Sequence, residues 1–387
     1  MNEDGELSFK VGLLGPARVG KTSIVATMLD AGQQLLTGTP VTMRPGDGED
    51  DETEDRISRV KRALLRSIRA EEFTPGSLGQ TQEKHEYRLR IDPGVPGAGV
   101  RFDLLDFPGE WLDPVKRLGL RRKEWEICRR FITQSTVLII PVDASVLMEA
   151  DLKKYQGAWP YILTIDKIEE VAGDWASERH MKPDEPGLLV FCPVKCESYF
   201  ADNGGWKDNS QELFNRFADV YGDVLRRVRA EAPKVRSIYC PVDTLGCVEL
   251  IYADWIPNDD DQGGWRFKPT FAFRSDPPGS TPKIKPKGVD DILVSLCSQL
   301  LTARRIVDGQ RASLQGQQRR VADEIAGRRE GLFKDMWLWI SGERDRRRKA
   351  AEQFGMTEAE TLQRVKALEK ILTDIAGRAR GSRTRDL

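Results

Sequence analysis

The chain has 387 residues, a length that allows one large domain with additions, or two domains. Hydrophobic residues make up 39% of it and charged residues 31%, a balance typical of a folded, soluble protein rather than a disordered one. The 60 basic and 61 acidic residues nearly cancel, so the total charge gives no reason to expect a nucleic-acid binder. The longest aliphatic stretch, residues 137–140, is far shorter than the roughly 20 residues of a membrane helix, and the acidic start does not resemble a signal peptide. We therefore expect a cytoplasmic protein.

Histidine and cysteine usage excludes several chemistries. His85 and His180 are the only histidines, one in an alternating strand-like run and one in a polar loop, so neither is expected to be catalytic. Serine-histidine triads and multi-histidine metal sites are effectively excluded. Six cysteines lie in apolar segments without a CxxC pair, which predicts buried reduced thiols rather than disulfides or a zinc site: Cys128, Cys192, Cys196, Cys240, Cys247 and Cys297.

The first elements in chain order are a strand, a glycine loop and a helix. Residues 7–14 form a short apolar run, residues 15–22 form the loop, and a helical pattern continues to about residue 36. Residues 47–55 hold seven carboxylates and are expected to form a solvated loop. Apolar residues at helical spacing then predict an inserted helix over 54–72.

The middle of the chain predicts a sheet. Residues 86–91 and 100–105 alternate on either side of a turn-rich segment, which predicts an antiparallel hairpin. Apolar runs at 137–142, 188–194 and 237–242 are separated by helical patterns around 115–134, 158–171 and 209–231. Such alternation predicts an α/β fold with a mostly parallel sheet that is flanked by helices.

The last third has a different composition. Residues 256–288 are rich in Pro, Gly and Asp and are expected to form a loop or a small hairpin insertion, after which a helix over 289–307 should close the sheet. Residues 309–380 are helical in pattern. From Arg304 to Leu387 there are 20 basic and 13 acidic residues, a net charge of +7, which leaves about −8 for the remainder. We predict a nucleotide-binding domain over 1–308, with insertions at about 44–72 and 256–288, and a basic α-helical extension over 309–387.

Residues 15–22 match the pattern GxxxxGK[ST] between a buried strand and a helix. Glycines at these positions let backbone N–H groups surround a β-phosphate, Lys21 reaches the β- and γ-phosphates, and Thr22 offers its hydroxyl to Mg²⁺. The N-terminus of the following helix favours the anion further. The expected nucleotide contacts from this segment are Gly15, Ala17, Arg18, Val19, Gly20, Lys21, Thr22 and Ser23.

A second motif, Asp106-Phe107-Pro108-Gly109, ends the 100–105 strand. A carboxylate beside a phosphate loop can hold a Mg²⁺ water, and a glycine three residues later can offer its N–H to a γ-phosphate. Asp106 and Gly109 fit this DxxG arrangement, which is weak as an isolated tetrapeptide but strong at a strand end after a phosphate loop. The alternative is an ordinary turn.

These two motifs resemble those of the translation-factor-related class of P-loop GTPases. Within that class the chain is similar to the bacterial YcjX-like proteins and to the double-GTPase proteins of conflict systems. The resemblance rests on residues 18–22 and 106–112 and covers about residues 1–255, loosely beyond the two motifs. It implies a switch that binds GTP or GDP with Mg²⁺ and senses the γ-phosphate through two loops.

Members of that class usually carry a threonine that closes over Mg²⁺ before the second strand. Thr81, just ahead of the predicted 86–91 strand, is our first choice, and Thr74 is the second. Both lie in a segment rich in Pro, Gly and Ser, where a turn or N-cap role is the competing interpretation.

Base recognition departs from the class pattern. The class uses [NT]KxD after its fifth strand, and this chain has Val194-Lys195-Cys196-Glu197. Lys195 is kept, Glu197 keeps a carboxylate on a longer arm, and Val194 lacks the bracing side chain. Guanine is still preferred over adenine, because a carboxylate pairs with the N–H groups of guanine. Residues 243–246 resemble the last base-contact loop, with Thr244 and Leu245 as the contacts.

The residue expected to act in hydrolysis is also unusual. Ras-like members have Gln directly after DxxG, whereas this chain has Glu110. The carboxylate could accept a hydrogen bond from water, but its charge would oppose the nearby γ-phosphate. We therefore expect slow hydrolysis that needs a partner, a dimer or an arginine in cis. Arg18 is one candidate for that arginine, and a solvent-facing salt bridge is the alternative.

The C-terminal helices suggest a contact surface. Apolar residues from 359 to 375 recur at three- and four-residue steps, which fits an intramolecular helical hairpin better than a coiled coil. Residues 336–340 followed by the basic run 344–349 raise membrane-surface contact as an alternative, which we disfavour against contact with a protein effector or activating partner. The sequence leaves open whether the chain forms a homo- or hetero-oligomer.

The leading hypothesis is therefore a Mg²⁺-dependent GTPase switch. In the alternative, the chain is a non-hydrolysing, nucleotide-bound scaffold that assembles a multiprotein complex, which could serve in defence. A P-loop kinase is a weaker third hypothesis, because such kinases lack the DxPG motif at this place.

Overall fold

The computed structural model describes residues 7–46, 52–70, 81–94, 100–117, 119–150, 154–155, 158–182, 185, 187–203, 207–257, 265–275, 279–299, 301–302, 366, 370–378 and 380–387. Thr74, part of the acidic run and almost all of the predicted 309–380 helices lie outside these residues. The two Trp residues of the 336–340 run do so as well.

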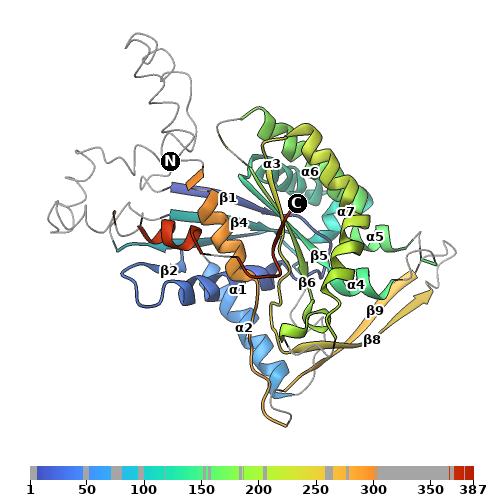
Figure 1. Cartoon of the computed structure of the whole chain (residues 1–387). Coiled ribbons are helices and arrows are strands. Elements are labelled where there is room, and N and C mark those ends of the chain that lie inside the picture. The colour runs from blue at the N-terminus through green and yellow to red at the C-terminus, as the bar shows by residue number, and fades with distance from the viewer. Residues whose placement is uncertain are drawn as a thin grey trace.

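An eight-stranded sheet forms the centre of the molecule (Figure 1), in the order β10-β7-β6-β5-β1-β4-β3-β2. Neighbours from β7 to β4 are parallel, whereas β3 pairs antiparallel with β4, β2 with β3, and β10 with β7. The predicted α/β class and the 86–105 hairpin are thus confirmed. The strands are Leu7–Leu13 (β1), Thr42–Pro45 (β2), His85–Asp92 (β3), Val100–Asp106 (β4), Val137–Asp143 (β5), Leu188–Val194 (β6), Arg236–Tyr239 (β7) and Arg385–Asp386 (β10).

The strand order places β1 at a reversal of the chain's path. Strand β4 pairs with β1 on one side. On the other side of β1 follow β5, β6 and β7, in that order. Ligands of open α/β sheets bind outside the carboxyl ends of the strands at such a switch point. Residues 15–20, which follow β1 directly, therefore occupy the expected binding position of this fold.

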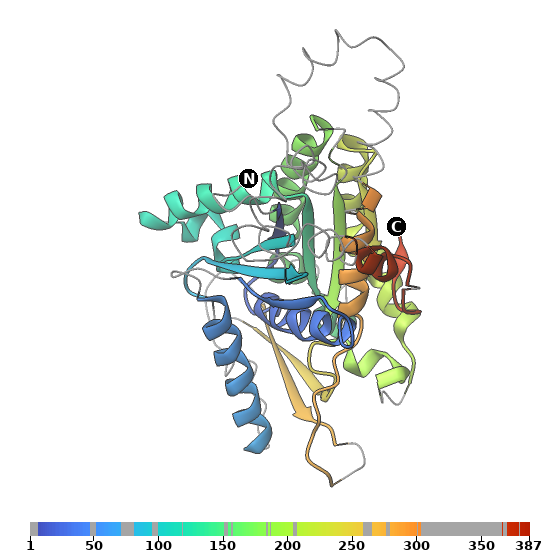
Figure 2. The ribbon, with the colours of Figure 1, turned by 90° about the vertical axis from the view of Figure 1, so that its left-hand side faces the viewer.

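Helices cover both faces of the sheet (Figures 1 and 2). One face packs against α1 and the helix of residues 289–299. The hydrophobic core on this side also contains Leu372 and Ile375 of a short helix at 370–376. The other face packs against α3, α6 and α7. The helices are Lys21–Leu35 (α1), Thr53–Arg69 (α2), Leu120–Gln134 (α3), Ala144–Glu149 (α4), Trp159–Leu163 (α5), Ile165–His180 (α6) and Ser210–Glu231 (α7).

A separate two-stranded sheet, Val248–Pro257 (β8) with Trp265–Phe273 (β9), extends from the body (Figure 1). The predicted insertion does contain a hairpin strand, but the hairpin begins at residue 248 rather than 256. Its base packs with Leu64 and Ile68 of α2 around Leu245. The two predicted insertions, one containing α2 and the other the hairpin, thus meet beside the 243–246 loop.

The C-terminus returns to the sheet. The sequence predicts only helix after residue 309, whereas Arg385–Asp386 form the edge strand β10 against β7. A two-residue strand leaves no alternating pattern long enough to detect, which explains the difference.

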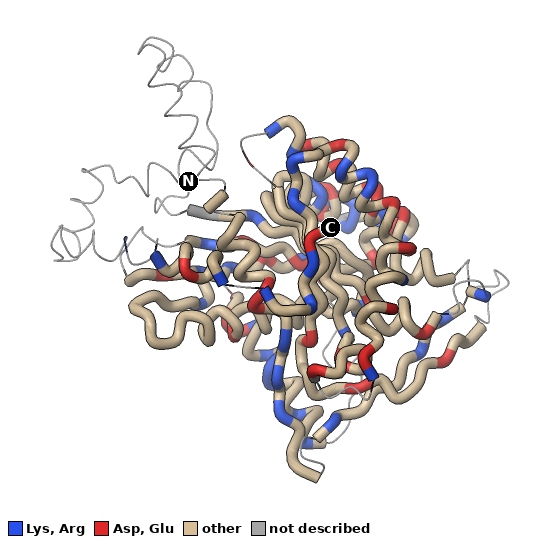
Figure 3. The backbone as a smooth tube through the Cα atoms, viewed as in Figure 1, with Lys and Arg blue, Asp and Glu red and all other residues tan. Residues whose placement is uncertain are grey.

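The six cysteines are all buried and none forms a disulfide, as predicted. Basic and acidic residues are interspersed along the described chain (Figure 3). Among the described helices, none is long and apolar enough to cross a membrane.

Candidate functional site

Residues 15–20 of the predicted phosphate loop connect β1 to α1, and two of them have left-handed backbone conformations. Gly20 has φ 104°, a left-handed conformation that glycine adopts without strain, and it directly precedes the first turn of α1. Arg18 is also left-handed, with φ 62°, and its side chain is exposed. Ala17 is exposed, and Val19 is buried beneath the loop. Ser23 lies in the first turn of α1, where its carbonyl accepts a hydrogen bond from Thr27.

Lys21 is the first residue of α1, and its side chain reaches back to the loop. Its side chain is 5% exposed, and Nζ donates to the carbonyls of Gly15 and Pro16, each at 3.0 Å. Burial lowers the pKa of Lys21, and the nearby Asp106 carboxylate opposes that shift. The ammonium group also lies 5.6 Å from the centre of the Phe107 ring. A buried cation held by neutral carbonyls at a helix N-terminus is suited to a phosphate anion.

Three predicted metal-binding side chains meet beside Lys21. The Thr22 hydroxyl donates to Asp106 Oδ2 at 2.6 Å and lies 3.4 Å from the Thr81 hydroxyl, which is 3.2 Å from the same carboxylate oxygen. The structure therefore brings Thr81, our first choice for the switch threonine, to this cluster. Asp106 is fully buried, and its second oxygen, Oδ1, has no partner among the described residues.

Strand β3 brings further residues to this cluster that the sequence did not indicate. His85 is opposite Asp106 in the β3–β4 register, and the Arg56 side chain from α2 contacts its Nδ1. Burial, then the Arg56 guanidinium, lower the pKa of His85. Tyr87 is buried, and burial and then Asp106 raise its pKa to about 12, although a hydrogen bond with Thr22 opposes the shift. The alternating pattern predicted a strand here, but not which residues of β4 lie opposite it.

Gly109 begins the 3-10 helix Gly109–Leu112 (η2) directly against the phosphate loop. A Cβ atom added there would lie 2.1 Å from the Ala17 nitrogen and 2.2 Å from the Pro16 carbonyl carbon. The DxxG glycine is therefore required by close approach of two backbones. Glu110, the next residue, points toward α3, where its carboxylate lies 3.7 Å from Arg121 and its side chain is 42% exposed.

The 194–197 segment begins at the last residue of β6 and lies beside the phosphate loop. A Cβ at Gly20 would have Val194 as its nearest neighbour, at 4.0 Å. Lys195 adopts a left-handed conformation, with φ 60°, and its ammonium forms an ion pair with Asp143. Asp143 in turn caps α4 by accepting from the backbone N–H of Ser145 at 3.1 Å. Lys195 is thus fixed by the carboxyl end of the neighbouring strand β5.

Glu197 and the 243–246 loop form one buried unit. Glu197 is 5% exposed, and its Oε1 accepts from the backbone N–H of Gly246 at 3.2 Å. Burial, then the neighbouring Asp243, raise the pKa of Glu197 to about 8. The carbonyl of Thr244 accepts weakly from Thr27 of α1 at 3.5 Å, and Leu245 is buried against α2 and β8. The structure therefore brings Glu197 to the predicted base-contact loop, and Thr244 of that loop contacts α1.

No protein-family model matches the chain, and no curated protein matches it.

A nucleotide and Mg²⁺ fit the residues present. The Lys21 ammonium group donates hydrogen bonds to main-chain carbonyls. One buried carboxylate oxygen of Asp106 has no partner among the described residues. Two hydroxyls and a carboxylate are the hard oxygen ligands that Mg²⁺ prefers, in the partial set that it uses together with phosphate oxygens and waters. Thr22, Thr81 and Asp106 would hold the cation directly or through water.

Proposed function

We propose that the chain is a Mg²⁺-dependent GTP-binding switch that hydrolyses GTP slowly. The observation that carries the proposal is the convergence of Thr22, Thr81 and Asp106 beside buried Lys21. These residues come from three separate segments and meet at the N-terminus of α1. A phosphate chain with its cation is the ligand that this combination of hydroxyls, carboxylate and ammonium suits best.

The fold supports the same proposal. The phosphate loop follows β1 at the reversal of strand order, and the segment carrying Thr81 precedes the antiparallel strand β3. This arrangement is compatible with the P-loop G domain that the sequence resemblance implies. Thr81 and Gly109 lie on two different segments around the loop, so both could respond to the presence of a γ-phosphate.

Guanine is the proposed base. Glu197 supplies a carboxylate beside the 243–246 loop, and an ionised carboxylate accepts hydrogen bonds from the ring and exocyclic N–H groups of guanine. Adenine presents an acceptor at its ring nitrogen in the corresponding position. The proposed preference is thus a matter of donor and acceptor pattern.

Slow hydrolysis follows from Glu110 and from what surrounds it. When bound, Mg²⁺ would neutralise charge on the transferring phosphoryl group. The Glu110 carboxylate adds a negative charge at the end of the DxxG segment, which opposes charge build-up on the phosphate oxygens. Its contact with Arg121 offsets this charge only partly, because both side chains are about half exposed.

A change of thermal stability with nucleotide tests the binding proposal. The chain should be stabilised by GTP with Mg²⁺ and by GDP, less by GTP with a chelator, and little by ATP with Mg²⁺. Stabilisation by ATP without any effect of GTP would exclude the guanine assignment. Lys21→Ala should remove the stabilisation by either nucleotide.

One observation favours the second candidate, a nucleotide-bound scaffold without hydrolysis. The carboxylate that would orient water is engaged by Arg121 of α3 rather than directed into the loop. Single-turnover phosphate release, measured with and without candidate partners, separates the two functions. Release under any of these conditions supports the GTPase, and its absence under all of them supports the scaffold.

A further inference from the structure

The last residues of the chain, 380–387, are built into the body, and we call them the C-terminal tail. Its strand β10 pairs with β7, and the backbone N–H of Leu387 donates to Ser237 at 3.0 Å. Asp386 binds Arg380 of the tail and Arg236 of β7, the latter at 3.0 Å. The tail therefore continues the central sheet past the strand that precedes the 243–246 loop.

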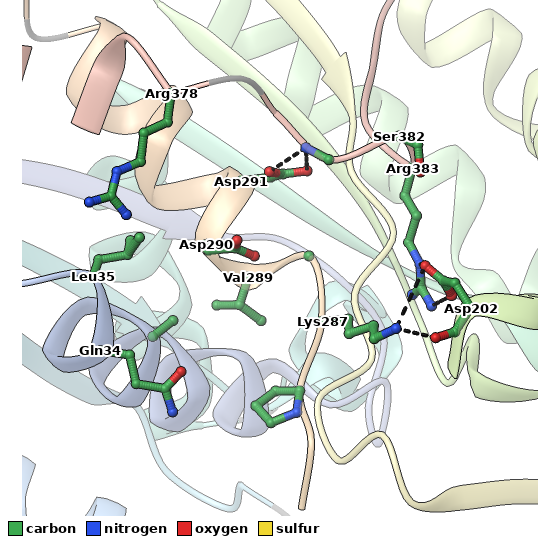
Figure 4. A pocket seen from close by; sticks show the side chains of 14 residues that line it. Gln34, Leu35, Asp202, Lys287, Val289, Asp290, Asp291, Arg378, Ser382 and Arg383 are labelled. Atoms are coloured by element: carbon green, nitrogen blue, oxygen red, sulfur yellow. Dashed lines mark hydrogen bonds and ion pairs between the residues drawn. The ribbon is translucent and has the colours of Figure 1, made fainter. Parts of the chain in front are cut away.

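Arg383 is the buried anchor of the tail. Its side chain is 5% exposed, and Nη1 donates to Asp243 at 2.7 Å. Its Nε donates to Asp202 at 2.9 Å, and the guanidinium lies 4.0 Å from the centre of the Phe200 ring. Figure 4 shows Arg383 and Lys287 converging on Asp202 from different segments. A buried guanidinium is retained only when its donors are matched, as they are here by two carboxylates.

Asp243, the partner of Arg383, is the first residue of the proposed base-contact loop and is fully buried. Its backbone exchanges two hydrogen bonds with Lys287, both at 3.0 Å, and the carbonyl of Leu245 accepts from Lys285 at 2.9 Å. The loop thus lies between the 285–287 segment, Glu197 and Arg383. Arg383 and Asp243 are 140 positions apart in the sequence, and the contact between them fixes the first residue of the loop.

The tail has a second anchor on the helix of residues 289–299. The backbone N–H of Gly381 donates to both carboxylate oxygens of Asp291, at 2.9 and 3.0 Å, and the Thr384 hydroxyl donates to the same group. A cavity of about 410 Å³ lies between this anchor, α1 and the tail (Figure 4). Because of that cavity, the tail contacts the body at discrete points, of which Arg383 is the one that reaches the loop.

We propose that Arg383 is a positioning residue for the recognition of the nucleotide base. The docked tail holds Asp243 and so keeps the 243–246 loop and Glu197 in register for guanine. This inference rests on the proposed function, since it assumes that guanine binds at this loop. According to this inference, affinity for the base depends on the C-terminal tail, whereas affinity for the phosphates does not.

The test compares Arg383→Ala with Arg385→Ala in the full chain. Arg385 lies on the same tail, but it contacts Gln211 and Phe214 of α7 instead of the loop, which makes it a matched control. Affinities are measured for GDP, IDP and GMP with Mg²⁺. The ratio of GDP to IDP affinity reports contacts with the exocyclic amine of the base, and the ratio of GDP to GMP affinity reports contacts with the β-phosphate.

We expect Arg383→Ala to weaken GDP binding about tenfold or more and to lower the GDP to IDP ratio, while the GDP to GMP ratio is kept. Arg385→Ala should keep both ratios. Asp202→Asn, which leaves the Arg383 contact with Asp243 in place, should give a smaller loss in the same direction, and it supplies a second variant if Arg383→Ala does not fold.

Three results would overturn the inference. Unchanged GDP affinity and ratios in both Arg383→Ala and Asp202→Asn would show that the tail does not position the loop. An equal fall of both ratios would indicate general disruption of the site. If the natural sequence binds no guanine nucleotide, the proposed function fails as well, and that outcome is distinct from the first two.

Discussion

The phosphate end and the base end of the proposed nucleotide site are held by different kinds of contact. At the phosphate end, Lys21 bonds to carbonyls five and six residues away, and the close approach of Gly109 leaves no room for a side chain. At the base end, Glu197 depends on Gly246, and Asp243 depends on Arg383 from the far C-terminus. The phosphate end is therefore built from motifs that can be recognised in the sequence, whereas the base end also depends on Arg383, which no motif indicates. The two ends can be altered separately, which makes the comparison testable.

The largest effect is expected at the phosphate end, from Lys21→Ala. Loss of a buried charge-assisted contact costs about 3 kcal/mol, which corresponds to roughly a hundredfold weaker binding of GTP and GDP. Fluorescent-nucleotide titration measures the change. Lys10→Ala is the control, because Lys10 lies on β1, ahead of the phosphate loop, and its side chain contacts Gln134 and the Phe131 ring instead of the loop. Nucleotide affinity that survives the loss of Lys21 would show that the phosphates bind elsewhere.

Asp106→Asn should separate the cation from the phosphates. The amide keeps an acceptor for Thr22 but removes the negative charge that favours Mg²⁺, so we expect a loss of about 2 kcal/mol, or roughly thirtyfold, in Mg²⁺-supported GTP binding. GTP affinity is titrated with Mg²⁺ and with a chelator, and the difference between the two conditions should shrink in the variant. Asp103→Asn on the same strand, whose carboxylate pairs with Arg101 at 2.8 Å, is the control. An unchanged response to Mg²⁺ in Asp106→Asn would exclude the proposed metal site.

The phosphate end and the base end also differ in how far the sequence could predict their structure. The phosphate loop, the DxxG segment and the strand and helix pattern are contiguous signals, and the strand and helix pattern predicted the α/β sheet. The family resemblance gave Thr81 as first choice and Thr74 as second for the threonine near the cation, and Thr81 lies 3.4 Å from Thr22. The DxxG motif also singled out Gly109, although its proposed contact with a γ-phosphate stays a prediction. The packing of that glycine on Pro16 and Ala17 needed the structure.

The base end could not be predicted to the same extent. Arg383 lies in a basic run that looks solvated, and nothing local indicates that it is buried between Asp202 and Asp243. Strand β10 is too short to leave a periodic pattern, and the predicted insertion begins at residue 256, whereas the hairpin begins at Val248. Such contacts join residues more than a hundred positions apart, and single-sequence periodicity carries no information about pairing at that range.

Glu197 offers a smaller and pH-dependent test of the base end. In the free protein its pKa is raised to about 8, whereas an ionised carboxylate is needed to accept from guanine. Binding must therefore release a proton below pH 8, and GDP affinity should rise with pH by up to about tenfold per unit and level off above 8. Glu197→Gln should show a flatter profile and weaker guanine preference. Equal pH dependence in both proteins would rule out this carboxylate as the base contact.

The same shift affects stability without nucleotide. When folding raises the pKa of a carboxyl group, the folded protein binds more protons at that group than the unfolded chain does. This holds at pH values between the ordinary carboxyl pKa and about 8. The group's contribution to stability is therefore lost as the pH rises through about 8. Thermal unfolding between pH 6.5 and 8.5 should show a steeper decline for the natural sequence than for Glu197→Gln, which keeps an acceptor for the Gly246 N–H.

The smallest effect is expected from Glu110→Gln, which returns to the phosphate end and tests its chemistry rather than its affinity. Removing the charge should leave GTP affinity within a factor of about two and raise the single-turnover rate of phosphate release several-fold, since about 1 kcal/mol of repulsion corresponds to roughly a fivefold change. Arg121→Gln should act in the opposite direction, because it leaves the Glu110 carboxylate without its cation. A slower rate in Glu110→Gln would mean that the carboxylate assists water after all. The phosphate end would then carry its own catalytic group.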